Sequence, residues 1–284
     1  MDLLTDERTS PGHPVPWPGA RVEFLATSGA PSLRVARIGE GQPLLLINGL
    51  GANLEMWQPL VRELRGEREL VAFDLPGTGR SARPRWPLRM PQLARVVTDL
   101  LDALDYVKLD VLGYSLGGIV AQELAKRAPD RIRRLVLCAT TPGMPSIPPD
   151  PIVTALMLTP ARYWNRQLAE LILPIIAGGR TARDPRVLRA GLEKRLVQPP
   201  SALGYLYQLY ALSGWSSHPW IRHVRHRTLV LHGDRDPVVP LVNGRYLADA
   251  LPHGRLEVVR GAGHLFLLDE PASITPALLS FLDA

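Results

Sequence analysis

The chain has 284 residues, of which 46% are apolar and 21% charged, so its composition indicates a globular protein of one or two domains and excludes a disordered chain. No apolar run approaches the ~18 residues that a transmembrane helix needs, and residues 1–8 lack the apolar stretch of a secretory signal. Cys138 is the single cysteine, which excludes an intramolecular disulfide; we expect a cytoplasmic protein. The net charge is +6, but no basic stripe with interleaved aromatics is present, and we expect no nucleic-acid partner.

The predicted elements begin after an N-terminal arm. Residues 1–20 hold four prolines without periodicity and are expected to be flexible. Residues 21–27 and 32–38 alternate like the strands of a hairpin, and residues 43–48 (PLLLIN) form a continuous apolar run, which is typical of a strand buried on both faces. Further strands are predicted at 69–74, 109–113, 134–139, 228–232 and 255–259, and helices at 56–65, 91–104, 116–127, 241–250 and 272–282.

This alternation of strands and helices predicts an α/β architecture, a mostly parallel central sheet with helices on both faces. The alternation is interrupted once. Residues 143–227 lack buried-strand runs and show helical spacing at 152–158, 163–176, 186–196 and 202–212. We therefore expect a core formed by residues 21–142 and 228–284, with residues 143–227 inserted as a helical cap. The cap carries 11 basic and 4 acidic residues, a balance that could attract an anionic surface.

A nucleophile is predicted at Ser115. The stretch Gly113-Tyr114-Ser115-Leu116-Gly117 is a G-x-S-x-G motif between a predicted strand and a predicted helix. Glycines on either side of the serine relieve crowding at such a sharp turn. The serine oxygen then stands at a helix N-terminus, where developing negative charge is favoured.

Serine needs a base, and the expected chain order is Ser, acid, His. His264 lies in a loop directly after a predicted strand, at the edge where open α/β sheets build their sites. The preceding strand ends in His232-Gly-Asp-Arg-Asp-Pro237, which offers two aspartates. Asp236, further out in the loop, is the preferred acid. Asp234 is the alternative, although a turn-capping role suits it better.

Two backbone N–H groups are expected to stabilise the oxyanion of the tetrahedral intermediate. One belongs to Leu116, which follows the nucleophile. The other is predicted at Leu50, because the glycines of Asn48-Gly49-Leu50-Gly51 let the backbone approach closely. No cofactor is expected. No metal is expected either, since the spacing of His218, His223 and His226 does not match a zinc site.

Together these segments resemble the α/β-hydrolase superfamily: NGLG at 48–51, DLPGTGRS at 74–81, GYSLGG at 113–118, HGDRDPVVP at 232–240 and GAGH at 261–264. Within it, the chain is similar to the intracellular medium-chain-length poly(3-hydroxyalkanoate) depolymerases. That resemblance is carried by NGLGANLEMW (48–57), SARPRWPLRMPQLA (81–94), TPARYW (159–164), AGGRTARDPR (177–186), GYLYQLYALSGWSS (204–217) and GHLFLLD (263–269).

The resemblance implies a Ser115–Asp236–His264 triad and hydrolysis of polyester stored in cytoplasmic granules. It also implies that the side chain at position 116 borders the acyl site, where the group often has tryptophan and this chain has leucine. We expect a serine ester hydrolase that acts on medium-chain polyester or related apolar acyl esters, with a cap that docks on a granule or lipid surface. The alternatives are a carbon–carbon bond hydrolase or perhydrolase of the same fold, and a slow-turnover ligand receptor.

Overall fold

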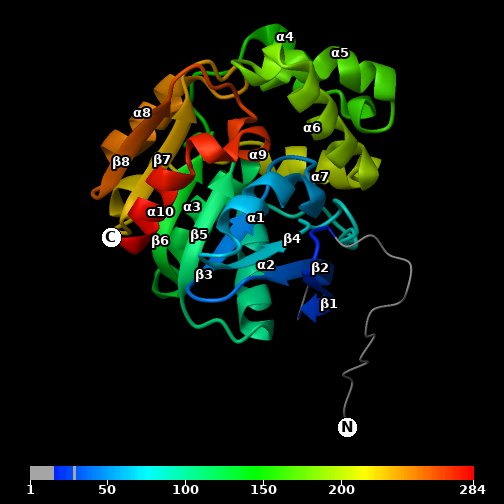
Figure 1. The fold of residues 1–284 in the computed structure, drawn as a ribbon. Coiled ribbons are helices and arrows are strands. Elements are labelled where there is room, and N and C mark those ends of the chain that lie inside the picture. Colours follow the sequence, from blue (N-terminus) through cyan, green and yellow to red (C-terminus); the bar gives the residue numbers. More distant parts are fainter. Residues whose placement is uncertain (1–15, 28–29) are drawn as a thin grey trace.

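The computed structural model describes residues 16–27 and 30–284 of the chain (Figure 1). Most of the predicted N-terminal arm, residues 1–15, lies outside this part. The described end of the arm packs on the core: Trp17 is buried, and its indole Nε1 donates a hydrogen bond to the Leu54 carbonyl at 3.0 Å. Any flexible arm therefore ends before this tryptophan.

Eight strands form one sheet in the order β1-β2-β4-β3-β5-β6-β7-β8. The predicted hairpin is formed by β1 (Arg21–Thr27) and β2 (Ala30–Ile38), which pair antiparallel, and β2 also pairs antiparallel with β4 (Glu69–Phe73). All other neighbours are parallel, through β3 (Pro43–Ile47), β5 (Leu109–Tyr114), β6 (Ile132–Cys138), β7 (Thr228–Gly233) and β8 (Gly254–Val259). The predicted mostly parallel sheet is confirmed.

Helices cover both faces of the sheet (Figure 1). One face packs against α1 (Gln58–Leu64), α9 (Phe266–Asp269) and α10 (Thr275–Asp283), and the other against α2 (Met90–Ala103), α3 (Leu116–Arg127) and α8 (Leu241–Ala250). Alternate residues of a strand point to opposite faces. Leu44 and Leu46 of β3 thus face the first layer, and Leu45 and Ile47 the second, which is why this run is apolar throughout.

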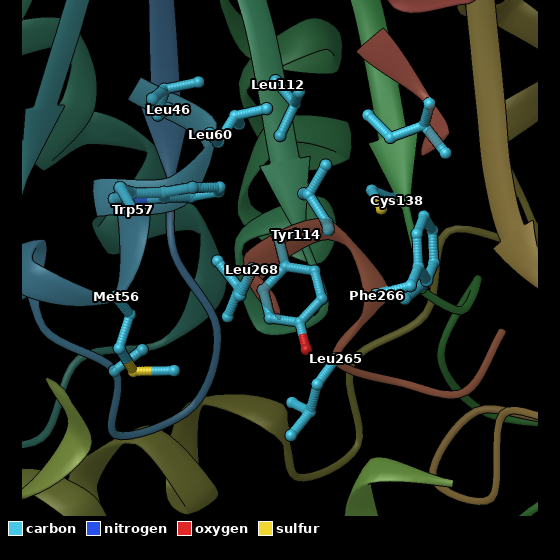
Figure 2. Packing of buried hydrophobic residues seen from close by; sticks show 14 of the residues in the cluster. Leu46, Met56, Trp57, Leu60, Leu112, Tyr114, Cys138, Leu265, Phe266 and Leu268 are labelled. Atoms are coloured by element: carbon cyan, nitrogen blue, oxygen red, sulfur yellow. The ribbon is translucent and has the colours of Figure 1, made fainter. Parts of the chain in front are cut away.

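Figure 2 shows the first of these layers. Leu46 of β3 and Leu112 of β5 lie near Leu60 and Trp57, and Cys138 of β6 lies beside Phe266. Cys138 is fully buried, and burial raises the pKa of its thiol well above the ordinary value. The cysteine is therefore an unreactive core residue, as the apolar strand around it predicts.

Four helices lie between β6 and β7: α4 (Pro151–Met157), α5 (Arg166–Ala177), α6 (Pro185–Val197) and α7 (Ala202–Leu212). They gather beside one end of the sheet (Figure 1). Side-chain caps set where they begin, because Asn165 accepts from the Leu168 N–H and Ser201 from the Gly204 N–H. The first of these caps starts α5 three residues later than the helical spacing predicts. No strand of the sheet comes from residues 143–227.

Candidate active site

Ser115 occupies a sharp turn between β5 and α3. Its backbone has φ 54° and ψ −117°, a conformation that residues with a side chain rarely adopt and that is concentrated at functional sites. The Ser115 N–H donates to the Cys138 carbonyl at 2.9 Å, and its carbonyl accepts from the Thr140 hydroxyl at 2.7 Å. A Cβ at Gly117 would overlap with the Ile47 carbonyl. Glycine there lets α3 begin directly against β3 and hold the turn.

His264 lies within hydrogen-bonding distance of Ser115, although 149 residues separate them. Its Nε2 is 3.1 Å from the Ser115 Oγ, and its Nδ1 is 2.8 Å from the Asp236 Oδ2. The backbone of the histidine is fixed on both sides: its N–H donates to the Ala177 carbonyl at 2.7 Å, and its carbonyl accepts from the Tyr114 hydroxyl at 3.0 Å. In Figure 2 the Tyr114 hydroxyl points toward this segment, beside Leu265.

Asp236 is oriented by its own loop. Its Oδ1 accepts from the N–H groups of Val238 and Val239, both at 2.8 Å, which leaves Oδ2 for the imidazole. The alternative acid, Asp234, is engaged elsewhere: its Oδ1 accepts from the Gly261 N–H at 2.6 Å. The structure thus brings Asp236 to His264 and uses Asp234 to join the two loops.

A second histidine, which the sequence analysis passed over as a strand end, lies behind the acid. His232 is fully buried, with Nε2 2.8 Å from the Val239 carbonyl and 3.7 Å from the Asp236 Oδ2. Burial lowers the pKa of His232 below its ordinary value. A neutral imidazole there leaves the Asp236 charge available to His264.

The loop predicted to hold the oxyanion lies against the serine. A Cβ built on Gly49 would be 3.3 Å from the Ser115 Cβ. Within the described part of the chain, the backbone N–H groups of Leu50 and Leu116 have no hydrogen-bond acceptor. Both donors are therefore available beside the Ser115 side chain.

The cap holds this loop in place through contacts that no local pattern reveals. The Gly51 N–H donates to the Gln208 Oε1 at 2.8 Å, and the Tyr163 hydroxyl donates to the Leu50 carbonyl at 2.8 Å. Both side chains come from the segment between β6 and β7, more than 100 residues along the chain. Tyr163 is one aromatic among many in the cap, and nothing in the sequence distinguishes it.

Ser115 and His264 open into a cavity of about 60 Å³ between cap and core. Its lining is mostly apolar: Ala52, Met56, Met157, Ala169, Leu173, Ile176, Leu192 and Leu265. Two arginines, Arg162 and Arg195, also line it. The Leu116 side chain packs into the layer of α2 and α3 and is not among the residues that line this cavity, which differs from the position that the resemblance implies.

The described residues contain no group of three or more His, Cys, Asp or Glu side chains suited to a metal ion. The cap histidines are dispersed: the His218 ring packs on Tyr246 with centroids 4.5 Å apart, and the His226 Nε2 is 2.9 Å from the Pro129 carbonyl. Nor does any helix of the described chain have the length and apolarity needed to cross a membrane.

Comparison with known proteins identifies the family. Residues 42–271 match the family model of the alpha/beta hydrolase fold. The chain belongs to the α/β-hydrolase family. It is 41% identical over 240 residues to a poly(3-hydroxyalkanoate) depolymerase of Ectopseudomonas oleovorans, a match that covers 84% of each chain. The resemblance stated from the sequence motifs is confirmed.

Solved structures of other α/β-hydrolases share the whole architecture. A hydrolase from Pseudomonas aeruginosa PA01 superposes with a TM-score of 0.79 at 28% identity, covering 93% of this chain and 98% of that one. An enol-lactonase from Burkholderia xenovorans LB400 superposes with a TM-score of 0.80 at 26% identity, covering 92% and 100%. The chain therefore shares its fold with these two proteins over nearly its whole length, including the helices between β6 and β7.

Proposed function

We propose that this protein is a cytoplasmic serine carboxylic-ester hydrolase that acts on medium-chain 3-hydroxyalkanoate polyester or related apolar acyl esters. The observation that carries the proposal is the continuous hydrogen-bonded series Ser115–His264–Asp236, with distances of 3.1 and 2.8 Å, at the edge of an apolar cavity. The 41% identity to a poly(3-hydroxyalkanoate) depolymerase supports the substrate class.

The reaction follows from the geometry as a two-step acyl transfer. The Ser115 Oγ attacks the ester carbonyl while the His264 Nε2 takes its proton. Asp236 keeps the proton of the imidazole on Nδ1 and stabilises the imidazolium that forms. His264 then gives its proton to the leaving alcohol, which breaks the ester bond and leaves an acyl group on Ser115. Water, deprotonated by the same imidazole, attacks the acyl-enzyme and regenerates the serine.

The oxyanion of each tetrahedral intermediate is stabilised by the N–H groups of Leu50 and Leu116 in this proposal. The support is their position beside Ser115 and their lack of an acceptor in the described chain. Removing one such donor typically costs about 100- to 1000-fold in turnover. No cofactor takes part in these steps.

The test is hydrolysis of p-nitrophenyl esters with two to twelve acyl carbons, together with clearing of a medium-chain polyester latex, by the wild type and Ser115→Ala. We expect activity on the longer esters and on the latex, with both lost in the variant. Ester hydrolysis without clearing would contradict the polymer substrate but not the chemistry. Absence of serine-dependent turnover would favour the carbon–carbon hydrolase or receptor alternatives, and peroxide-dependent oxidation would favour a perhydrolase.

We also propose that the cap docks on the surface of a polyester granule. Large apolar side chains are exposed along its helices: Ile152 on α4, Leu171 and Ile175 on α5, and Leu203, Leu206 and Tyr210 on α7. Leu171 and Ile175 are four residues apart, so they share one face of α5. Exposed apolar side chains that gather in one part of a surface are typical of contact with an apolar partner.

A pelleting assay with granules tests the docking. The double variant Leu171→Ser/Ile175→Ser should lose binding and latex clearing but keep hydrolysis of short soluble esters. The matched control is Val107→Ser, which removes an exposed apolar side chain from the loop before β5, outside the cap. Equal loss in both variants, or no loss in the double variant, would contradict docking through the cap.

A further inference from the structure

Arg195 is a buried cation inside the apolar cavity that contains Ser115. It comes from α6 of the cap, and only 8% of its surface is exposed. Ser115 and His264 line the same cavity, so an acyl group bound to Ser115 extends into the space that the Arg195 side chain borders. Burying a charged side chain is unfavourable unless its donors are paired. The hydrogen-bond partners of the Arg195 guanidinium therefore indicate whether this side chain serves the fold or a bound ligand.

The other arginine of the cavity is used by the fold. The Arg162 Nη1 donates to the carbonyls of Leu156, Met157 and Thr159, and its Nη2 donates to the Tyr205 hydroxyl at 2.7 Å. This guanidinium closes the C-terminal end of α4, where helix carbonyls lack partners. It has an evident structural role.

Arg195 is paired on one side only. Its Nη1 is 3.7 Å from the Oδ1 of Asp269, a buried carboxylate on α9. Its Nη2 is buried and has no hydrogen-bond partner among the described residues. A buried donor left in this state is unfavourable, and a ligand oxygen that enters the cavity would satisfy it.

The charges of Arg195 and Asp269 determine which kind of ligand oxygen suits the Arg195 Nη2. Asp269 already pairs with the guanidinium, so a second carboxylate at Nη2 would lie close to the negative charge of Asp269 and be repelled by it. A hydroxyl or an ester oxygen accepts a hydrogen bond without that penalty. Simple fatty acyl groups carry no such oxygen. A 3-hydroxyacyl group carries such an oxygen on C3, two carbons away from the carbonyl carbon that Ser115 attacks.

We propose that Arg195 is a specificity-determining residue, whose Nη2 donates a hydrogen bond to the oxygen on C3 of the bound acyl group. This inference rests on the proposed ester hydrolysis and deepens it. It predicts that the enzyme prefers 3-hydroxyacyl esters to plain acyl esters of the same length.

The test compares p-nitrophenyl 3-hydroxyoctanoate with p-nitrophenyl octanoate, with each kcat/KM divided by the rate of alkaline hydrolysis of that ester. The wild type should prefer the hydroxy ester about 10- to 100-fold, the value of a hydrogen bond to a charged group. Arg195→Met, which keeps the apolar length and removes the donors, should abolish this preference and retain activity on the octanoate. Arg189→Met is the matched control, because Arg189 is exposed on the same helix.

Each result bears on the inference separately from the proposed function. A wild-type ratio near one, or an unchanged ratio in Arg195→Met, would overturn the role of Arg195. If Arg195 only tied α6 to α9, Asp269→Asn would abolish the preference as well; we expect that variant to keep it. If Arg195→Met does not fold, the wild-type ratio alone decides. Absence of Ser115-dependent hydrolysis of either ester would instead overturn the proposed function.

Discussion

At the scale of single residues, hydrogen bonds hold Asp236 and His264 in one orientation. Asp236 gives one carboxylate oxygen to two backbone N–H groups and the other to His264, and His264 is fixed through its backbone by Ala177 and Tyr114. Such fixed hydrogen bonds preorganise the imidazole, because no reorganisation is needed when charge develops. The two neighbouring aspartates of the loop therefore have different effects on activity.

Asp236→Asn should lower kcat about 10⁴-fold, because an amide in this position favours the wrong tautomer of His264. Asp234→Asn should remain within about tenfold of the wild type, since an amide oxygen still accepts from the Gly261 N–H. Steady-state kinetics with one soluble ester checks both variants. Equal losses, or a larger loss in Asp234→Asn, would show that the acid is assigned to the wrong residue.

At the scale of elements, the cap is fastened to both catalytic loops. Gln208 and Tyr163 bind the loop of Leu50, and the chain after α5 pairs with the loop of His264, where the Arg180 N–H donates to the Gly261 carbonyl at 2.8 Å. A shift of the cap would therefore move the oxyanion donors and the base. If the proposed chemistry holds, these helices would position the reacting groups as well as cover the cavity.

Gln208→Met and Tyr163→Phe should each reduce kcat about 10- to 100-fold and leave KM nearly unchanged, since the loop loses an anchor that matters only when the oxyanion forms. Tyr207→Phe on α7 serves as the control, because its hydroxyl interacts with Arg83 away from the cavity. A rise in KM at constant kcat would instead indicate that these side chains contact the substrate.

Asp74, in the turn after β4, connects this turn to the segment of Leu54 and to β2. This buried carboxylate accepts from the N–H groups of Leu54 and Arg80 and pairs with Arg34 at 3.4 Å. Burial raises the pKa of Asp74 to about 6, against the opposing effect of Arg34. The folded chain therefore holds this proton more tightly than the unfolded chain, in which the pKa is near 3.8.

This contribution to stability is present at low pH and is lost as the pH rises through about 6. Relative to Asp74→Asn, whose side chain does not titrate, the wild type should gain about 2 kcal/mol of unfolding free energy between pH 7.5 and pH 4.5. Urea unfolding of both proteins at the two pH values measures the difference. A constant difference, or a relative loss at pH 4.5, would contradict the raised pKa.

In the whole molecule, the basic residues of the cap segment do not all lie on one exposed surface. Arg162 and Arg195 are buried in the cavity, and Arg166 and Arg180 pair with glutamates. Arg225 and its neighbour Arg227 lie at the amino end of β7, whereas the site lies at the carboxyl ends of the strands. In the proposed docking, the apolar side chains of α4, α5 and α7 would make the contact, although Arg183, Arg186 and Arg189 are also exposed in this segment.

Binding to granules should accordingly change less than about threefold between 0.05 and 0.5 M NaCl, because salt screens exposed charges and does not weaken apolar contacts. The measurement is the fraction of protein that pellets with granules across this range. A tenfold loss at the higher salt would assign the docking to the exposed arginines instead.

The predictable part of this protein is local. Apolar runs of the right length predicted the core strands, and the predicted bounds of α3, α7 and α8 matched the structure to the residue, because turn residues flank each helix in the sequence. Ser115, Asp236 and His264 were predicted together because all three follow strands whose carboxyl ends meet at one edge of the sheet.

Contacts between distant segments were decided only by the folded chain. The four-residue helix α9 has no periodicity to detect, and the side chain of Leu116 could face either the cavity or the core until α3 packed. Gln208 and Arg195 are ordinary residues of polar or amphipathic helices in the sequence. In the folded chain Gln208 accepts from the Gly51 N–H and Arg195 lines the cavity. Such contacts depend on three-dimensional packing and leave no periodic trace along the chain.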